Sequence, residues 1–276
     1  MKRNQVLLII AILYFALMVF PNATGAENLN MVAIFEKDEF AQYEHAIRML
    51  TPGDSLYDTV RHFVVYLHYF YGYPFYLLSA IMLLPYRLLA GMDWVSSTQS
   101  IMLLLRQLVS VLPMILAIAL MAGMQTRHKS KFIGLGLFVF LLAVPAVIVN
   151  NFWWHPDSLA VLLIVLVFYC LDRDDLDFGI FFYLAAFTCG VAFSVKYAGA
   201  FFVLAIPAYL VYGIFKKRLP WKRGLFLAPL FVIIMALGLV ISNPLLLLPM
   251  ERQAILDTVQ RQIVQTRIGY YSVNPQ

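Results

Sequence analysis

Two adjacent carboxylates, Asp38 and Glu39, are the side chains of this sequence best suited to chemistry. They follow the first long apolar run, residues 6–20, in a polar segment. One carboxylate can take the proton of an attacking hydroxyl, while its neighbour orients that hydroxyl or binds a divalent cation, Mg²⁺ or Mn²⁺. The pair can equally open a helix, because apolar residues follow at helical spacing and carboxylates stabilise a helix N-terminus. The sequence leaves both roles open.

Three more polar side chains stand at the edges of apolar runs: His155, Asp157 and Lys196. His155 and Asp157 are candidates for a second acidic or acceptor-binding site, and Asp157 for a metal ligand together with Glu39. Each has a structural alternative, because Asp157 follows a proline suited to a first helical turn and His155 has no second histidine at ligand spacing. Lys196 can hold a phosphate, or it can extend its charge to water at a membrane surface.

The composition indicates a membrane protein. Of the 276 residues, 62% are hydrophobic and 13% are charged, and the mean hydropathy is +0.81. Soluble domains carry about 25% charged residues. The length allows about seven helical crossings of about 20 residues each, so we predict an all-α polytopic membrane protein with a single module over residues 1–276. The two cysteines, Cys170 and Cys189, fall in apolar runs and indicate neither a disulfide framework nor a cysteine zinc site.

Basic residues set the predicted orientation, since Lys and Arg outnumber Asp and Glu by 20 to 15. They cluster at residues 2–3, 127–131 and 216–223. Beside apolar runs such clusters mark cytoplasmic loops, and they are not evidence for nucleic-acid binding. A single crossing must then separate the first two clusters after the first span, and we assign it to residues 101–124. Residues 62–90, rich in tyrosine and interrupted by proline, are expected to form interfacial helices in an outer loop, residues 21–100.

Alternating directions give the remaining crossings. The predicted crossings are residues 6–20, 101–124, 132–149, 158–171, 178–195, 198–215 and 225–241. This arrangement gathers the polar candidates on the outer side, where a surface helix is also expected over residues 251–268. Arg106, near the outer end of the second crossing, can pair with an acidic residue or anchor the helix at the interface. The small residues after the first run are also typical of a cleaved signal peptide.

These segments, in this order, resemble the GT-C superfamily of membrane glycosyltransferases. The matching segments are Asp38-Glu39 after the first crossing, Tyr71-Gly72-Tyr73-Pro74-Phe75-Tyr76 in the outer loop, His155-Pro156-Asp157, and Lys196-Tyr197-Ala198-Gly199. Each motif is short, so the resemblance rests on their order along the chain and on their predicted location on the same side of the membrane. The chain is most similar to the bacterial branch that includes relatives of protein O-mannosyltransferases and aminoarabinose transferases.

The resemblance implies an enzyme that moves a sugar from a polyprenyl-phosphate donor to an acceptor hydroxyl, with inversion. The reaction would take place at the outer, periplasmic face of a bacterial inner (plasma) membrane. Asp38 would act as general base, Glu39 would orient the acceptor or bind a cation, and Lys196 with Tyr197 would hold the donor phosphate. The acceptor can be a lipid, glycan or protein hydroxyl. Many relatives have more crossings, so the chain is expected to be one module of a longer protein.

A membrane transporter or lipid flippase is the rival class, because several apolar helices with polar residues can also line a pathway. Two features weigh against it. The polar residues gather at one face and not at mid-membrane, and the sequence has no inverted repeat with paired broken helices.

Overall fold

The computed structural model describes residues 3–125 and 131–268, and these ranges contain helices and no strand. This confirms the predicted all-α class. Lys2 and residues 127–130, which belong to the predicted cytoplasmic clusters, lie outside the described residues.

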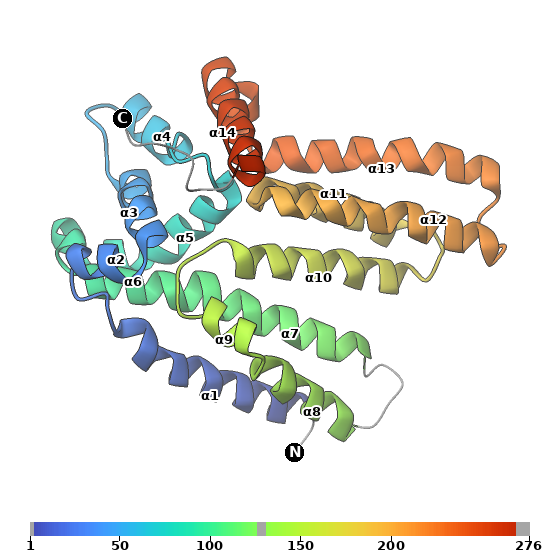
Figure 1. The fold of residues 1–276 in the computed structure, drawn as a ribbon, viewed down its shortest axis with the longest axis horizontal. Coiled ribbons are helices and arrows are strands. Elements are labelled where there is room, and N and C mark those ends of the chain that lie inside the picture. The colour runs from blue at the N-terminus through green and yellow to red at the C-terminus, as the bar shows by residue number, and fades with distance from the viewer. Residues whose placement is uncertain (1–2, 126–130, 269–276) are drawn as a thin grey trace.

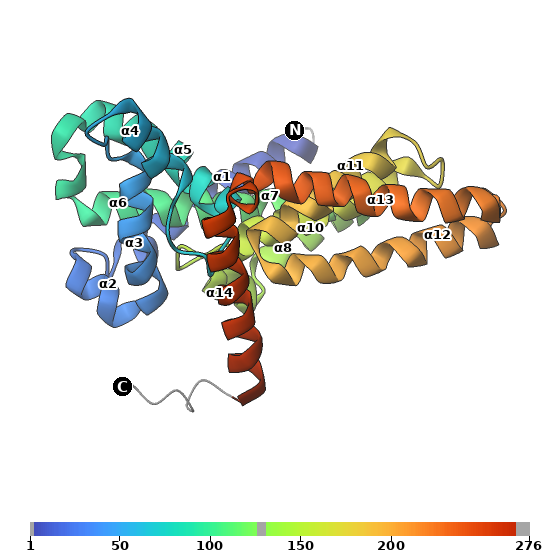
Figure 2. The same cartoon turned by 90° about the horizontal axis from the view of Figure 1, so that it is seen from above.

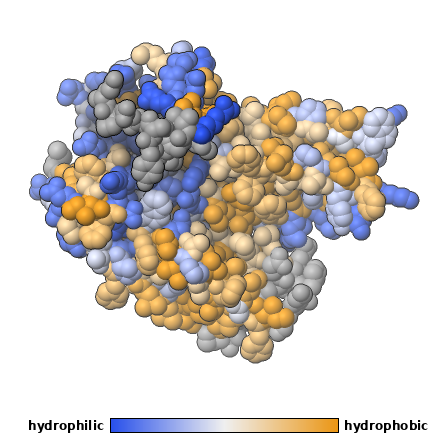
Figure 3. All heavy atoms as spheres, in the orientation of Figure 1, coloured by the Kyte–Doolittle hydropathy of each residue, from blue (hydrophilic) through white to orange (hydrophobic). Residues whose placement is uncertain are grey.

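Apolar helices lie side by side in a bundle, and helices that follow one another along the chain run in opposite directions (Figures 1 and 2). The bundle contains α1 (Arg3–Ala23), α7 (Leu112–Gln125), α8 (Lys131–Leu142), α10 (Asp157–Asp174), α11 (Ile180–Val195), α12 (Ala205–Phe215) and α13 (Trp221–Ser242). Contacts join α1 to α8, α8 to α7, α7 to α10, α10 to α11, α11 to α13 and α13 to α12. The outward side chains on the face seen in Figure 3 are mostly apolar, as expected of helices surrounded by lipid.

Among the described residues, five helices are long and apolar enough to cross a membrane. They are Asn4–Ala23, Tyr73–Ala90, Thr98–Met124, Tyr197–Phe215 and Trp221–Ser242. The second of them falls in the segment expected to be interfacial. Two of the predicted crossings form shorter apolar helices, Phe132–Leu142 and Ile180–Val195. The protein is thus an all-helical protein with membrane-length apolar helices, and the count of seven crossings stays a prediction.

The predicted crossing over residues 132–149 is broken in the structure. Helix α8 ends at Leu142, and a short helix, α9 (Pro145–Asn150), follows it. Pro145 lacks an N–H and keeps the preceding residue out of the helical region, and Val144 accordingly has φ −63° and ψ 126°. The pattern of apolar residues predicted the segment, and the proline determines where it divides.

The second predicted crossing is one long helix with an internal irregularity. It runs through α6 (Thr98–Leu105), η2 (Arg106–Val111) and α7, and η2 is a π-helical segment. The N–H of Leu112 accordingly bonds the carbonyl of Gln107. Such a segment holds one extra residue per turn, and these segments often occur at functional sites.

The segment expected to form the outer loop folds into a helical headpiece at one end of the bundle (Figure 1). The headpiece contains α2 (Leu29–Phe35), α3 (Lys37–Leu50), α4 (Leu56–Val64), α5 (Tyr73–Ala90) and the 3-10 helix η1 (Gly91–Ser96). Its core is aromatic: the ring of Phe75 stacks on Trp154 at 5.3 Å, and Tyr66 stacks on Tyr76 at 4.6 Å. These rings are buried. The helices of the outer loop are confirmed, and their side of the membrane stays a prediction.

The last helix, α14 (Pro249–Ile268), runs across the end of the bundle next to the headpiece (Figures 1 and 2). It follows α13 through a 3-10 turn, η4 (Pro244–Leu247). Ile255 inserts into the aromatic core of the headpiece, and Tyr69 donates a hydrogen bond to Glu251. The helix predicted over residues 251–268 is confirmed, and its first half is fixed to the headpiece.

Candidate functional site

A cavity of about 600 Å³ opens where the headpiece meets the end of the bundle. Its walls come from α3, the segment before α5, the loop before α10, the end of α11, and α14. The lining includes Asp38, Gln42, Tyr71, His155, Lys196 and Gln262. Small-molecule sites have volumes of about 300–1,000 Å³. The structure thus gathers three of the predicted site residues around one space of suitable size.

Asp38 reaches this cavity from the first turn of α3. One of its carboxylate oxygens lies 3.4 Å from the hydroxyl of Tyr71, which donates to it. The position also suits the positive end of the α3 dipole. Asp38 therefore lies both at the start of a helix and in the wall of the cavity. The helix-opening role and the catalytic role predicted from the sequence are thus compatible.

Lys196 and Asp157 form an ion pair at the bundle end of the cavity. The ammonium of Lys196 donates to Asp157 Oδ1, and the imidazole Nδ1 of His155 lies 3.0 Å from Asp157 Oδ2. The side chains of Lys196 and Asp157 are each 34% exposed. Both are therefore open to a ligand, although each already has an oppositely charged partner.

A chain of polar groups connects the two carboxylates, Asp38 and Asp157. His155 Nε2 lies 2.8 Å from the Tyr71 hydroxyl, which in turn lies beside Asp38. Trp153 stacks on the His155 ring at 4.2 Å and holds its orientation. The single proton of the Tyr71 hydroxyl can be given to Asp38 or to His155, but not to both at once. Because Tyr71 donates to Asp38, its oxygen can accept a proton carried by His155 Nε2, so the tautomer of His155 decides whether both contacts are hydrogen bonds at once.

His68 is a further cavity residue whose charge state is set by its surroundings. Burial, assisted by the neighbouring His45, lowers the pKa of His68 to about 4. Its Nδ1 lies 2.6 Å from the hydroxyl of Tyr76. The imidazole is accordingly neutral at pH 7, so this wall of the cavity offers hydrogen bonds and aromatic surface without charge.

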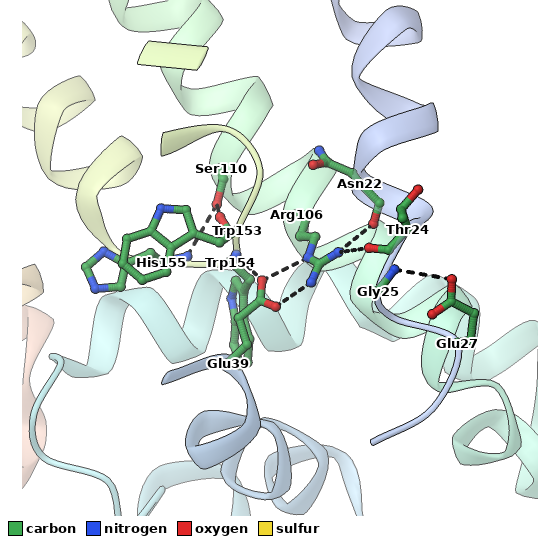
Figure 4. A network of polar contacts seen from close by, with 10 residues as sticks. All are labelled: Asn22, Thr24, Gly25, Glu27, Glu39, Arg106, Ser110, Trp153, Trp154 and His155. Atoms are coloured by element: carbon green, nitrogen blue, oxygen red, sulfur yellow. Dashed lines mark hydrogen bonds and ion pairs between the residues drawn. The ribbon is translucent and has the colours of Figure 1, made fainter. Parts of the chain in front are cut away.

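Glu39 does not line the cavity but is fully buried, beside Arg106 and Trp154 (Figure 4). Arg106 binds both carboxylate oxygens, with Nε 2.9 Å from Oε1 and Nη2 2.5 Å from Oε2. The backbone N–H of Trp154 donates to Oε1 at 2.5 Å. Arg106 also donates to the carbonyls of Asn22 and Thr24, at 2.8 and 3.1 Å. The pairing of Arg106 with an acidic residue is confirmed, and it joins the end of α1, α3 and the loop before α10.

The π segment η2 orients two side chains toward that loop. Arg106 begins the segment, and Ser110 lies one turn further along it. Ser110 Oγ donates to the carbonyl of Trp153 at 2.7 Å and accepts the N–H of His155 at 3.4 Å. The backbone on both sides of Trp154 is therefore fixed by η2, and His155 is held against the cavity.

The predicted metal pair of Glu39 and Asp157 does not fit this geometry. Both oxygens of Glu39 are bound by Arg106, and both oxygens of Asp157 face Lys196 or His155. A divalent cation shared by these two carboxylates would have to displace two positively charged or hydrogen-bonding partners. Among the residues that the structure describes, no group of three or more His, Cys, Asp or Glu is placed to hold a metal ion.

Tyr197 lies next to Lys196 but is not part of the cavity lining. Its hydroxyl donates to the carbonyl of Tyr69 at 3.1 Å. The side chain thus attaches the start of the 3-10 helix η3 (Tyr197–Leu204) to the headpiece. This contact does not support the phosphate-binding role predicted for Tyr197.

The sequence predicted no site role for Gln42, His68, Gln262 or Gln265, which line the cavity together with Tyr71 of the aromatic outer-loop segment. For Gln42 a signal was available, because it follows Asp38 at a spacing of four residues, which puts both on one face of a helix. The other residues come from a loop and from α14, whose positions relative to α3 are fixed only by tertiary packing.

Comparison of the chain with protein-family models, with curated proteins and with solved structures found no match. The geometry of the cavity is therefore the basis for the proposed function.

Gly72 joins the headpiece to the bundle beside Lys196, and its replacement tests this junction. Its N–H donates to the carbonyl of Val195 at 3.1 Å, and a Cβ at this position would lie 1.4 Å from the carbonyl oxygen of Ser194. Gly72→Ala is expected to lower stability by about 1–3 kcal/mol through this clash. The measurement is the thermal midpoint in detergent, with Gly136→Ala as control, because a Cβ there meets no atom within 4 Å. Equal midpoints for the two variants would show that the junction is not close-packed.

Proposed function

We propose that the protein is a membrane glycosyltransferase that moves a sugar from a polyprenyl-phosphate donor to an acceptor hydroxyl. The observation that carries this proposal is that Asp38 and Lys196, on separate elements, line one cavity at the end of an apolar bundle. A lipid-linked donor needs a polar cavity next to apolar helices, because its tail stays in the bilayer while its phosphate and sugar lie outside the hydrocarbon region. We propose the outer face of a bacterial inner membrane as the location.

The reaction is a single displacement. The acceptor oxygen forms a bond to C1 of the sugar while the bond from C1 to the phosphate oxygen breaks, and the departing polyprenyl phosphate keeps that electron pair. The acceptor proton passes to Asp38, the cavity carboxylate without a cationic partner in the contacts described above. With one displacement and no enzyme nucleophile, the configuration at C1 inverts.

Lys196 stabilises the phosphate that leaves. An ammonium group has three donors, so Lys196 can bond to Asp157 and to a phosphate oxygen together. His155, held by Trp153 and by Ser110, orients Asp157 and Tyr71 between the two reacting groups. No step requires a divalent cation held by Glu39, and we assign Glu39 a structural role with Arg106.

The distribution of polar residues supports transfer over transport. The cavity lies at one end of the bundle, beside the headpiece. A transport pathway would need polar groups near mid-membrane.

Replacing Lys196 tests the proposed phosphate contact. Lys196→Met is expected to weaken binding of undecaprenyl phosphate by about tenfold to a hundredfold, because a charge-assisted hydrogen bond in a partly shielded site is lost. Lys196→Arg should lose less. The measurement is the affinity of the purified protein in detergent for this lipid.

Asp157→Asn provides the matched control, because it removes the ion pair and keeps the lysine. If Lys196 binds phosphate, Asp157→Asn should hold the lipid at least as tightly as the wild type. If Lys196→Met binds undecaprenyl phosphate as well as the wild type, the lysine is an interfacial anchor and the proposed donor site is wrong.

A further inference from the structure

Gln42 is a buried amide whose hydrogen-bonding groups are unused. Its side chain is 0% exposed, and neither its amide nitrogen nor its amide oxygen has a hydrogen-bond partner among the described residues. Buried amides are almost always hydrogen-bonded, because leaving them unpaired costs free energy. An unpaired amide beside a cavity is therefore available to hydrogen-bond a ligand in that cavity.

The position of Gln42 relates it directly to the proposed base. Gln42 lies four residues after Asp38 on α3, so both side chains are on the face that borders the cavity. Gln42 is among the residues that line the cavity, although its side chain is closed to solvent. Across the cavity, α14 contributes Gln262 and Gln265. Amide side chains thus border the cavity from two different elements.

The chemistry of these walls selects a class of ligand. An amide offers one donor group and one acceptor, which matches a hydroxyl that both gives and takes a hydrogen bond. His68 is neutral at pH 7, and Phe70, a residue that is 39% exposed, adds apolar surface. A neutral ring that bears hydroxyls can hydrogen-bond the amides and pack on the aromatic side chains. An anion next to Asp38 would be repelled by its carboxylate.

We propose that Gln42 forms the hydroxyl-binding subsite of this cavity and that its ligand is the neutral sugar ring next to Asp38. The proposal rests on the proposed function and extends it, because it names the residue that recognises the sugar. The ring can belong to the donor or to a carbohydrate acceptor, and the experiment separates these sources.

The test uses Gln42→Leu, which keeps the size of the side chain and removes its polar atoms. Binding of methyl α-mannoside and methyl β-glucoside is measured by saturation-transfer NMR on the purified protein in a detergent without a sugar headgroup. We expect binding about threefold to tenfold weaker than in the wild type, the effect of one neutral hydrogen bond, and a thermal midpoint that is equal or higher. Gln42→Met serves as a second variant if the leucine variant does not fold.

Gln107→Leu is the matched control. Gln107 is 4% exposed and also has an unpartnered amide, but it lies in η2 and does not line the cavity. Its replacement should leave sugar binding unchanged. The subsite is refuted if the Gln42 variants bind both sugars as the wild type does, or if the wild type binds neither.

Two lipids identify the source of the ring. If Gln42→Leu weakens binding of undecaprenyl-phosphate glucose and not of undecaprenyl phosphate, Gln42 binds the donor sugar. If free sugars lose affinity and neither lipid does, Gln42 binds an acceptor sugar. A wild type that binds free sugars but neither lipid would remove the proposed donor and leave this subsite in place.

Discussion

Asp38→Asn is expected to lower sugar transfer by about a hundredfold to ten-thousandfold while the protein folds and binds donor nearly as well as the wild type. The amide keeps the shape of the carboxylate and its place in the first turn of α3, but it cannot accept the acceptor proton. A purely structural role at the helix start predicts the opposite result, because loss of a charge in the first turn costs only about 0.3–1 kcal/mol of stability and should leave activity intact. The measurement is transfer from a radiolabelled polyprenyl-phosphate sugar by the purified protein in detergent.

Glu44→Gln is the matched control for Asp38→Asn. Glu44 belongs to the same helix, is exposed, and does not line the cavity. Its replacement should leave the transfer rate unchanged. Wild-type turnover by Asp38→Asn would assign Asp38 to helix stability alone and would remove the principal residue of the proposed reaction.

The second large effect concerns the buried pair of Glu39 and Arg106. Removing one partner leaves the other charged and buried, which costs about 3–5 kcal/mol. Glu39→Gln and Arg106→Met are each expected to lower the thermal midpoint sharply and to reduce the yield of folded protein. The double variant should recover part of the loss, because no unpaired charge remains.

The same variants distinguish a structural Glu39 from a catalytic one. If Glu39 is structural, the turnover of each correctly folded Glu39→Gln molecule should stay near that of the wild type. A Glu39→Gln protein with wild-type stability and no turnover would contradict this assignment. It would restore the prediction, made from the sequence, that both members of the acidic pair take part in catalysis.

The helices were largely predictable from the sequence, because apolar length and charge are local properties of the chain. The predicted crossing over residues 225–241 corresponds to α13, and the surface helix over residues 251–268 corresponds to α14. The break before Pro145 was not predicted, although the proline that causes it was visible. Residues 62–90 were harder to place, because α5 has the length and hydropathy of a crossing. Only packing puts it with the headpiece.

The site was predictable in part. Asp38, His155, Asp157 and Lys196 come together, as the predicted topology requires, because the start of α3, the start of α10 and the end of α11 meet at one end of the bundle. The two members of the acidic pair separate, since neighbouring residues on a helix point about 100° apart. Which of them meets the cavity depends on Arg106, 67 residues away in the sequence. Such a partner choice could not be deduced from Asp38 and Glu39 alone.

The π segment Arg106–Val111 means that the long helix of α6, η2 and α7 does not keep a single phase along its length. One extra residue in a turn rotates everything before it by about 100° relative to everything after it. The part beside α8 and α10 can thus present its apolar stripe to its neighbours, while the outer part turns Arg106 toward Glu39. The direction in which Arg106 points is thus set by the extra residue of η2 and not by the apolar repeat of α7 alone.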